Sequence, residues 1–126
     1  ATSAQYADLA EMYSSDEQYA PGTVVVFGGE KEITISTAFG DERVAGVIST
    51  EPAHLMNSSM EGLPVALRGR VPVNVIGPVT KGDLLVSTTK GSARSEQEPK
   101  VGSVIGKALE SFNGETGIIE IVVGKL

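Results

Sequence analysis

The sequence predicts an all-β fold, a compact barrel or clip of short strands with an internal pseudo-twofold repeat, preceded by a short helical or extended N-terminal arm. Short apolar runs are bounded by Gly and Pro, and the middle of the chain alternates polar and apolar residues. Two stretches also resemble each other, Pro21–Gly29 (PGTVVVFGG) and Lys81–Gly91 (KGDLLVSTTKG). We therefore expect an arm at residues 1–18 and a single β domain over residues 19–126.

The first expected element is one or two helical turns within the arm. Its apolar residues fall at positions i, i+3, i+4 and i+7, which share one helix face: Tyr6, Leu9, Ala10 and Tyr13. The polar residues from Ser14 onward end this pattern. A helix this short is marginal alone. We therefore expect Tyr6, Leu9 and Tyr13 to contact the β domain or a neighbouring subunit.

Seven strand segments are expected in the β domain. Each is rich in β-branched or other apolar residues, and turn-forming residues separate most of them. The segments are Thr23–Phe27, Glu32–Thr37, Arg43–Thr50, Leu63–Val79, Asp83–Thr88, Val101–Leu109 and Ile118–Val123. The longest, Leu63–Val79, alternates almost throughout and predicts one bent strand or two, with Gly69 as a position for the bend.

The two similar stretches favour an internal repeat with units at about residues 21–50 and 81–110. When Gly22 is aligned with Gly82, the connecting loops differ by three residues. The alignment predicts equivalent core positions for Val24 and Leu84, for Val26 and Val86, and for Val47 and Val104. Each unit alone would expose an apolar face, so the two must pack together. The alternative is two unrelated hairpin-like segments of a Greek-key barrel.

Composition disfavours several classes of function. The chain has 126 residues, 10 basic and 16 acidic, for a net charge of −6. This sign repels phosphate backbones, so we expect no nucleic-acid partner. No apolar run approaches the ~20 residues that span a bilayer, so we expect no membrane insertion. The chain has no Cys, which excludes disulfides and thiolate chemistry.

The catalytic inventory is thin. His54 is the only His, and it stands in EPAHLMNSSMEG, a segment typical of a loop with two Met residues. The candidate partner-contact residues of this segment are His54, Leu55, Met56 and Met60. No spacing of carboxylates or His suggests a metal site, and Gly28-Gly29 lacks the Lys/Ser pair of a phosphate-binding loop. We therefore expect no metal and no cofactor.

Several strings, in order, resemble a C-terminal β module of phage tail-fibre and appendage-like proteins and of some large bacterial surface proteins. The resemblance runs from Tyr6 to Val123, and its most specific strings are PVALRGRVPV and KGDLLV. It implies a virion structural module that serves fibre assembly, capping or host-surface attachment. It also implies a homo-oligomer, most simply a trimer, in contact with upstream fibre segments. The bacterial cell surface is the alternative location.

The module is also similar to the autoprocessing intramolecular chaperone domain of phage neck appendages, which helps trimeric chains to fold and then cuts itself free. In that family an Asp that begins the domain and a Glu three residues later carry the cleavage chemistry, and Asp8 and Glu11 match this spacing. On a helix, this spacing would place both carboxyls on one face. Ala7 departs from the family, because a hydroxyl residue there could assist an acyl shift. No catalytic residue is favoured, and cleavage before Asp8 is the alternative function.

A carbohydrate- or receptor-binding tip is the third possibility. Host glycans and surface receptors are the partners that such a tip would contact. The chain has no Trp, and six aromatic residues are available to stack on a sugar: Tyr6, Tyr13, Tyr19, Phe27, Phe39 and Phe112.

Overall fold

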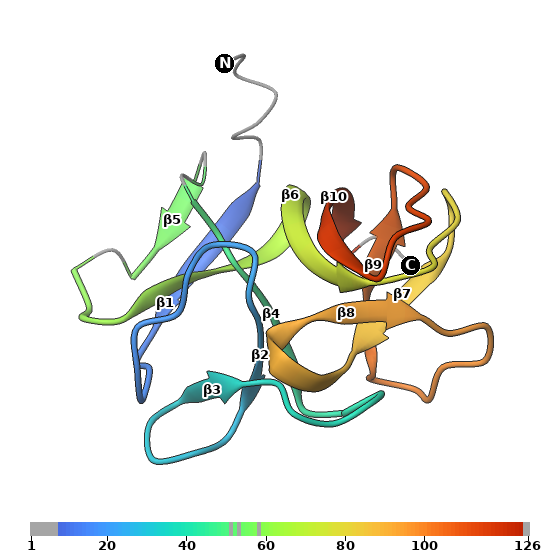
Figure 1. The fold of residues 1–126 in the computed structure, drawn as a ribbon. Coiled ribbons are helices and arrows are strands. Elements are labelled where there is room, and N and C mark those ends of the chain that lie inside the picture. The colour runs from blue at the N-terminus through green and yellow to red at the C-terminus, as the bar shows by residue number, and fades with distance from the viewer. Residues whose placement is uncertain (1–7, 51, 53, 58, 125–126) are drawn as a thin grey trace.

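The computed structural model describes residues 8–50, 52, 54–57 and 59–124, and there the regular structure is almost entirely β (Figure 1). The one exception is a short 3-10 turn, Thr89–Gly91. The strands are β1 (Leu9–Tyr13), β2 (Val24–Phe27), β3 (Ile33–Ile35), β4 (Val44–Ile48), β5 (His54–Met56), β6 (Leu63–Ile76), β7 (Leu84–Ser87), β8 (Ala93–Ser95), β9 (Val104–Ala108) and β10 (Thr116–Val123). The all-β prediction is confirmed. None of the described residues forms a helix that could span a membrane.

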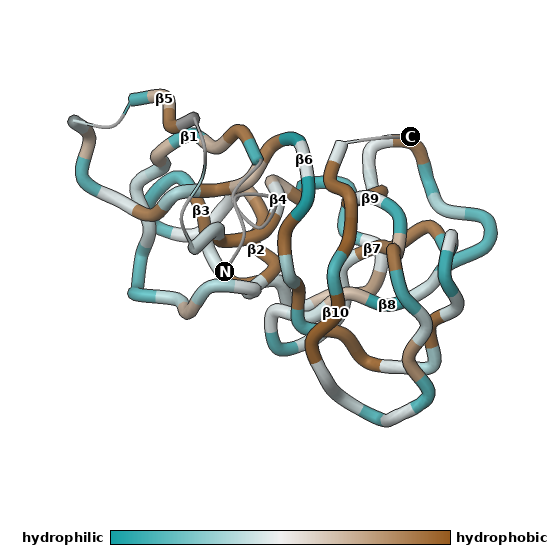
Figure 2. The backbone as a smooth tube through the Cα atoms, turned by 90° about the horizontal axis from the view of Figure 1, so that it is seen from above, coloured by the Kyte–Doolittle hydropathy of each residue, from teal (hydrophilic) through white to brown (hydrophobic). Residues whose placement is uncertain are grey.

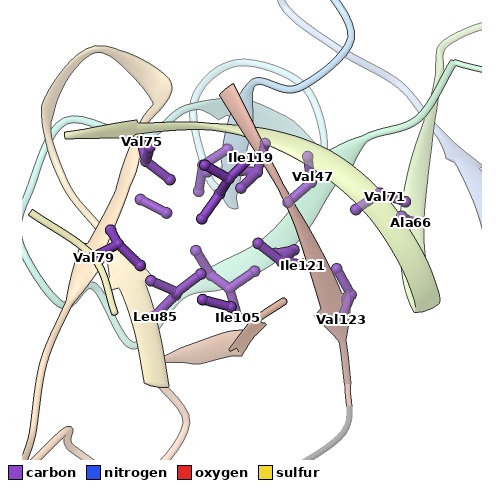
Figure 3. Close-up of a cluster of buried hydrophobic side chains, with 14 residues drawn as sticks. Val47, Ala66, Val71, Val75, Val79, Leu85, Ile105, Ile119, Ile121 and Val123 are labelled. Carbon is purple, nitrogen blue, oxygen red and sulfur yellow. The ribbon is translucent and has the colours of Figure 1, made fainter. Parts of the chain in front are cut away.

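Five of the strands close into a barrel. β6 pairs with β10, and the sheet continues through β9, β7 and β8 back to β6. The closing contact, Val75 opposite Ala93, is parallel, whereas the other ladders of the barrel are antiparallel. Buried aliphatic side chains fill the interior, among them Leu85, Ile105 and Ile121 (Figure 3). Removing this apolar surface from water is the main force that holds the barrel together.

The other five strands extend from the first half of β6. On one edge of β6 lies β4, followed by β2 and β3, and on the other edge lies β1, followed by β5. The strands before β6 and those after it lie mostly on opposite sides of β6 (Figures 1 and 2). A second buried cluster lies among β2, β3, β4 and the beginning of β6, and its residues are Val25, Ile33, Ile48, Leu63 and Val65.

The residues before and after β6 share one core. Val24 and Val47 belong to the same buried cluster as Leu85 and Ile105. Hydrogen bonds also cross between the two groups, because the Ser36 hydroxyl donates to the Thr88 carbonyl at 2.7 Å. The two groups are therefore packed as one body.

The structure makes the same ladder twice, with each residue number raised by 60. In the first ladder Val24 lies opposite Val47, Val25 opposite Gly46 and Val26 opposite Val44, with a bulge between Val25 and Val26. In the second ladder Leu84 lies opposite Lys107, Leu85 opposite Gly106 and Val86 opposite Val104, with a bulge between Leu85 and Val86. Gly22 and Gly82 both have φ of +93° before these strands.

The correspondence begins earlier than the predicted repeat units. The bridge between Ser15 and Ile33 is parallel, as is the pair 60 residues later, Val75 and Ala93. β1 pairs antiparallel with residues 63–68 of β6. In the same way, residues 69–76 of β6 pair antiparallel with β10. We use the name first half for residues 9–68 and second half for residues 69–124, so that β6 contributes to both. Gly69, with φ of +109°, lies at the junction.

The predicted alignment of the later strands was wrong by three residues. Val44, and not Val47, occupies the position of Val104, and the counterpart of Val47 is Lys107. The connecting loops therefore do not differ in length. The expected strand from Val101 begins only at Val104, and Val101 lies in a turn with 94% of its surface exposed. The predicted alignment matched Val47-Ile48 with Val104-Ile105 because the residue types agree. In the structure Gly46 corresponds to Gly106 instead.

The helical turns expected in the arm are also wrong, because Leu9–Tyr13 is the strand β1. In the described part of the arm, residues 8–18, the structure agrees with the extended form of the prediction. Five residues of β1 pair with β6, and three of them also pair with β5. Pairing on both edges overrides the weak helical pattern of a segment this short.

Candidate functional site

The segment with the candidate contact residues forms a flap at the edge of the sheet. We use the name flap for residues 54–57 and 59–61, which are β5 and the turn after it. β5 runs parallel to β1, with Leu55 opposite Ala10 and Met56 opposite Glu11. Part of the expected loop is therefore a strand, and β5 pairs with β1 alone among the described strands. The flap lies at the periphery of the molecule (Figures 1 and 2).

Polar contacts fix the turn of the flap. The Asn57 side-chain amide donates to the Glu11 carboxylate on β1. Asn57 has φ of +59°, a left-handed conformation that Asn tolerates better than most residues. The Met60 amide then donates to the Asn57 carbonyl at 3.0 Å. These bonds hold the turn in one position relative to β1.

The flap presents apolar side chains to solvent. Leu55 is 36% exposed, Met56 42% and Met60 38%. A single exposed apolar residue is normal on a protein surface, whereas this short flap carries three of them. Met side chains also adapt to the shape of a partner surface. These exposed side chains are available for a contact, and the partner-contact role of the flap stays a prediction.

A hollow lies beneath the turn of the flap. It has a volume of about 600 Å³ and is lined by residues of the flap, of β1, of the segment after β1 and of the β2–β3 connection, among them Met60, Met12, Ser15 and Lys31. Gly62 closes its base, where a Cβ atom would overlap the Tyr13 carbonyl. Only glycine allows the chain to pass so close to β1.

Asp8 is buried at the point where the chain enters β1. Only 1% of its surface is exposed, and its carboxylate accepts a hydrogen bond of 2.7 Å from the Ser49 hydroxyl. Ser49 itself follows β4 and is 5% exposed. If the arm has only a structural role, the sequence predicts that the Asp8 and Glu11 carboxyls face solvent, and for Asp8 this prediction is wrong. Sequence reasoning missed Ser49, because nothing in the local pattern links residues 41 positions apart.

Glu11 has different partners from Asp8. Its carboxylate accepts hydrogen bonds from Asn57 and from the Tyr13 hydroxyl, the latter at 3.3 Å. Partial burial and the adjacent Glu11 carboxylate raise the pKa of the Tyr13 hydroxyl. Because β1 is a strand, the argument that a helix places Asp8 and Glu11 on one face no longer holds. The peptide between Ala7 and Asp8 lies outside the described residues.

The remaining predicted contact residues are placed as follows. Leu9 is half-buried in β1, and the Tyr13 ring packs edge-on against Phe27 with 5.3 Å between ring centroids. Tyr6 lies outside the described residues. His54 lies in β5, but the structure does not describe its side chain.

Metal ligands do not converge in the described part of the chain, where no group of three or more His, Cys, Asp or Glu residues could hold an ion. Neither protein-family models nor curated proteins give a match to this chain. The candidate site therefore rests on its own geometry: an apolar flap, a hollow beneath it and a buried carboxylate at the start of β1.

Proposed function

We propose that this chain is a structural module of a phage virion, a C-terminal β domain of a tail-fibre or appendage-like protein that acts in assembly, capping or attachment. The resemblance of ordered strings supports this function. The string PVALRGRVPV forms most of β6, the strand that both halves share, and KGDLLV leads into β7. The resemblance thus involves the central strand of the fold as well as surface turns.

The flap is the observation that carries the proposal. In the second half, residues 109–115 connect β9 to β10, and the backbones of Val79 and Phe112 exchange two hydrogen bonds of 2.8 Å there. The corresponding connection of the first half, residues 49–62, adds β5 and three exposed apolar side chains. The barrel of the second half closes without such a strand, so closure alone does not explain the flap. A contact with a partner surface would explain why the flap is present.

The proposed partner is a second copy of the chain, and the assembly is most simply a trimer within the virion. β5 offers an edge that pairs with nothing else among the described strands, and an edge strand beside apolar side chains is suited to association. Identical copies present the same flap, so a closed cyclic assembly repeats one contact.

The oligomeric state tests this proposal. Light scattering after size-exclusion chromatography should give three times the 13.1 kDa mass of the chain. Replacing Met56 and Met60 together by Ser should yield a monomer with unchanged circular dichroism. Val101→Ser, which alters a more exposed apolar residue outside the flap, is the matched control and should leave the trimer intact. A monomeric wild-type chain at high concentration would contradict the proposal.

Self-processing is a second candidate because Asp8 is buried. A carboxylate held next to the preceding peptide can act as base or nucleophile. Intact-mass spectrometry distinguishes the two functions. Cleavage before Asp8 in the wild type, lost in both Asp8→Asn and Glu11→Gln, would establish processing. A whole chain in all three proteins would exclude it.

We also propose that the two halves are copies of one unit related by an approximate twofold rotation. The repeated ladder, its two bulges and the equivalent glycines support this proposal. An experimental structure tests it by superposition of residues 9–48 on residues 69–108. A good fit with a rotation far from 180° would contradict the twofold relation.

A further inference from the structure

We propose that a groove lined by residues of both halves binds an uncharged saccharide. Two hollows share Glu96. The first has a volume of about 130 Å³ and is bordered by Phe39, Val86 and Lys100 among others. The second has a volume of about 450 Å³ and is bordered by Arg94 and Gln97 among others. We call this pair of hollows the Phe39 groove. It does not include the flap, so the proposal is independent of the assembly function.

The Phe39 ring is displayed on a fixed loop. The buried Ser87 holds both sides of this loop, because its hydroxyl donates to the Ala38 carbonyl and accepts from the Asp41 amide, both at 2.9 Å. The Ser87 carbonyl also accepts from the Gly40 amide at 2.9 Å. Phe39 between these anchors is nevertheless 50% exposed. An aromatic ring held rigidly in solvent provides a binding face with little loss of entropy.

Arg94 lies over one face of this ring, with its guanidinium carbon 5.0 Å from the ring centroid. This cation–π contact orients the five N–H donors of the guanidinium beside the groove. Pro99 adds apolar surface next to Phe39. The groove thus places a planar donor group next to an apolar floor.

Charged side chains of both signs line the groove. Glu96 and Glu98 offer acceptors, whereas Arg94 and Lys100 offer donors. Asp83 also borders the second hollow, but its carboxylate accepts hydrogen bonds from the Ser95 hydroxyl and the Thr80 amide. A strongly anionic or cationic ligand would meet like charges anywhere along the groove. The balance favours a neutral ligand.

A pyranose satisfies these conditions together. Its C–H face can lie on the Phe39 ring, and its hydroxyls both donate and accept, so they can bond to carboxylates and to cations alike. The first hollow is smaller than the 300–1,000 Å³ of a drug-sized pocket, which suits a single sugar ring. The second hollow, reached past Glu96, has room for a further ring. The groove therefore fits a short, uncharged oligosaccharide.

Amide NMR spectra of the ¹⁵N-labelled chain test the proposal. The probes are glucose, galactose, N-acetylglucosamine and rhamnose, each titrated to about 50 mM, with arginine as a cationic comparison. At least one sugar should cause saturable shifts confined to residues 39–40, 86 and 94–103. Phe39→Ala should weaken binding about tenfold, and Glu98→Gln should weaken it without disturbing the fold. Phe27→Ala, which removes a 43% exposed ring that does not border the groove, should leave binding unchanged.

Several results would overturn the saccharide site. These are no saturable shift with any of the four sugars, shifts scattered over the molecule, or equal losses in Phe39→Ala and Phe27→Ala. Saturable shifts with arginine but with no sugar would instead identify a cation site.

Discussion

Gly46 and Gly106 occupy the same position in the two ladders, each next to the extra residue that makes the bulge in its own strand, β4 or β9. A Cβ atom at Gly46 would overlap the Ala66 carbonyl oxygen, and one at Gly106 would overlap the Val122 carbonyl oxygen. These contacts are with backbone atoms, which cannot turn aside as a flexible side chain can. The two glycines thus set how closely β4 approaches β6 and how closely β9 approaches β10.

Replacement of either glycine by Ala should therefore be costly. We expect Gly46→Ala and Gly106→Ala each to lower the free energy of unfolding by more than about 2 kcal/mol, as measured by urea denaturation. Gly40→Ala is the matched control. It has φ of +65° but nothing within 4 Å of the new Cβ, so only the conformational cost of about 1 kcal/mol remains. Equal effects at all three sites would show that close approach is not the cause.

Asp8 and Ser49 provide a second test at the residue scale. Ser49→Ala should leave the buried carboxylate without its hydroxyl donor and lower the free energy of unfolding by about 1–3 kcal/mol. Ser59→Ala, an exposed substitution in the flap, should change stability little. If Ser49→Ala is as stable as the wild type, the hydrogen bond contributes nothing to the position of Asp8.

At the scale of elements, Asp16 ties the segment after β1 to the β2–β3 hairpin. Its carboxylate accepts hydrogen bonds from the Tyr19 hydroxyl at 2.7 Å and from the Thr34 hydroxyl at 2.8 Å. The Tyr19 bond, with help from Thr34, holds the pKa of Asp16 below its usual value. Burial, together with Asp16, raises the pKa of Tyr19. This contact orders the loop that connects β1 to β2.

The lowered pKa of Asp16 predicts a dependence of stability on pH. The ionised form is favoured in the folded state, so its contribution is complete above the unfolded pKa of about 3.9 and is lost as pH falls through the lower folded pKa. Asp16→Asn should therefore unfold more easily than the wild type near pH 6, with the difference shrinking below pH 4. Thermal melts across this range measure it, with Glu17→Gln as control. A constant difference at every pH would contradict the assignment.

The sequence predicted strands better than it predicted their partners. A run of β-branched residues such as Thr23–Phe27 predicts a strand from its own composition, and β2 lies within this run. The segment that became β1 had a weak helical pattern, and only its pairing with β6 and β5 decided the outcome. The bond between Asp8 and Ser49 joins distant positions, so no local pattern could reveal it. Phe39 was one of six aromatic candidates. It differs from the others because hydrogen bonds to Ser87 fix the loop that carries it, and these bonds join distant positions.

At the scale of the whole molecule, the halves share their core, so neither should fold alone. Val24 and Val47 pack in the cluster that also contains Ile105 and Ile121. A polypeptide of residues 1–68 and one of residues 69–126 should each lack cooperative unfolding by circular dichroism. Mixed together, they should recover the amide spectrum of the intact chain. Cooperative unfolding of either piece by itself would show that one half has a self-sufficient core.

The shared strand β6 also has a kinetic consequence. Its partners β1 and β10 come from opposite ends of the chain, each separated from its pairing position on β6 by about fifty residues. Each ladder therefore requires the closure of one long loop, and topologies dominated by such distant pairs fold in milliseconds to seconds. During synthesis, β1 can find its partner once the first half of β6 has left the ribosome, but the barrel has to wait for β10. Until then the second half of β6 presents an unpaired edge, and neighbouring nascent chains could pair with it.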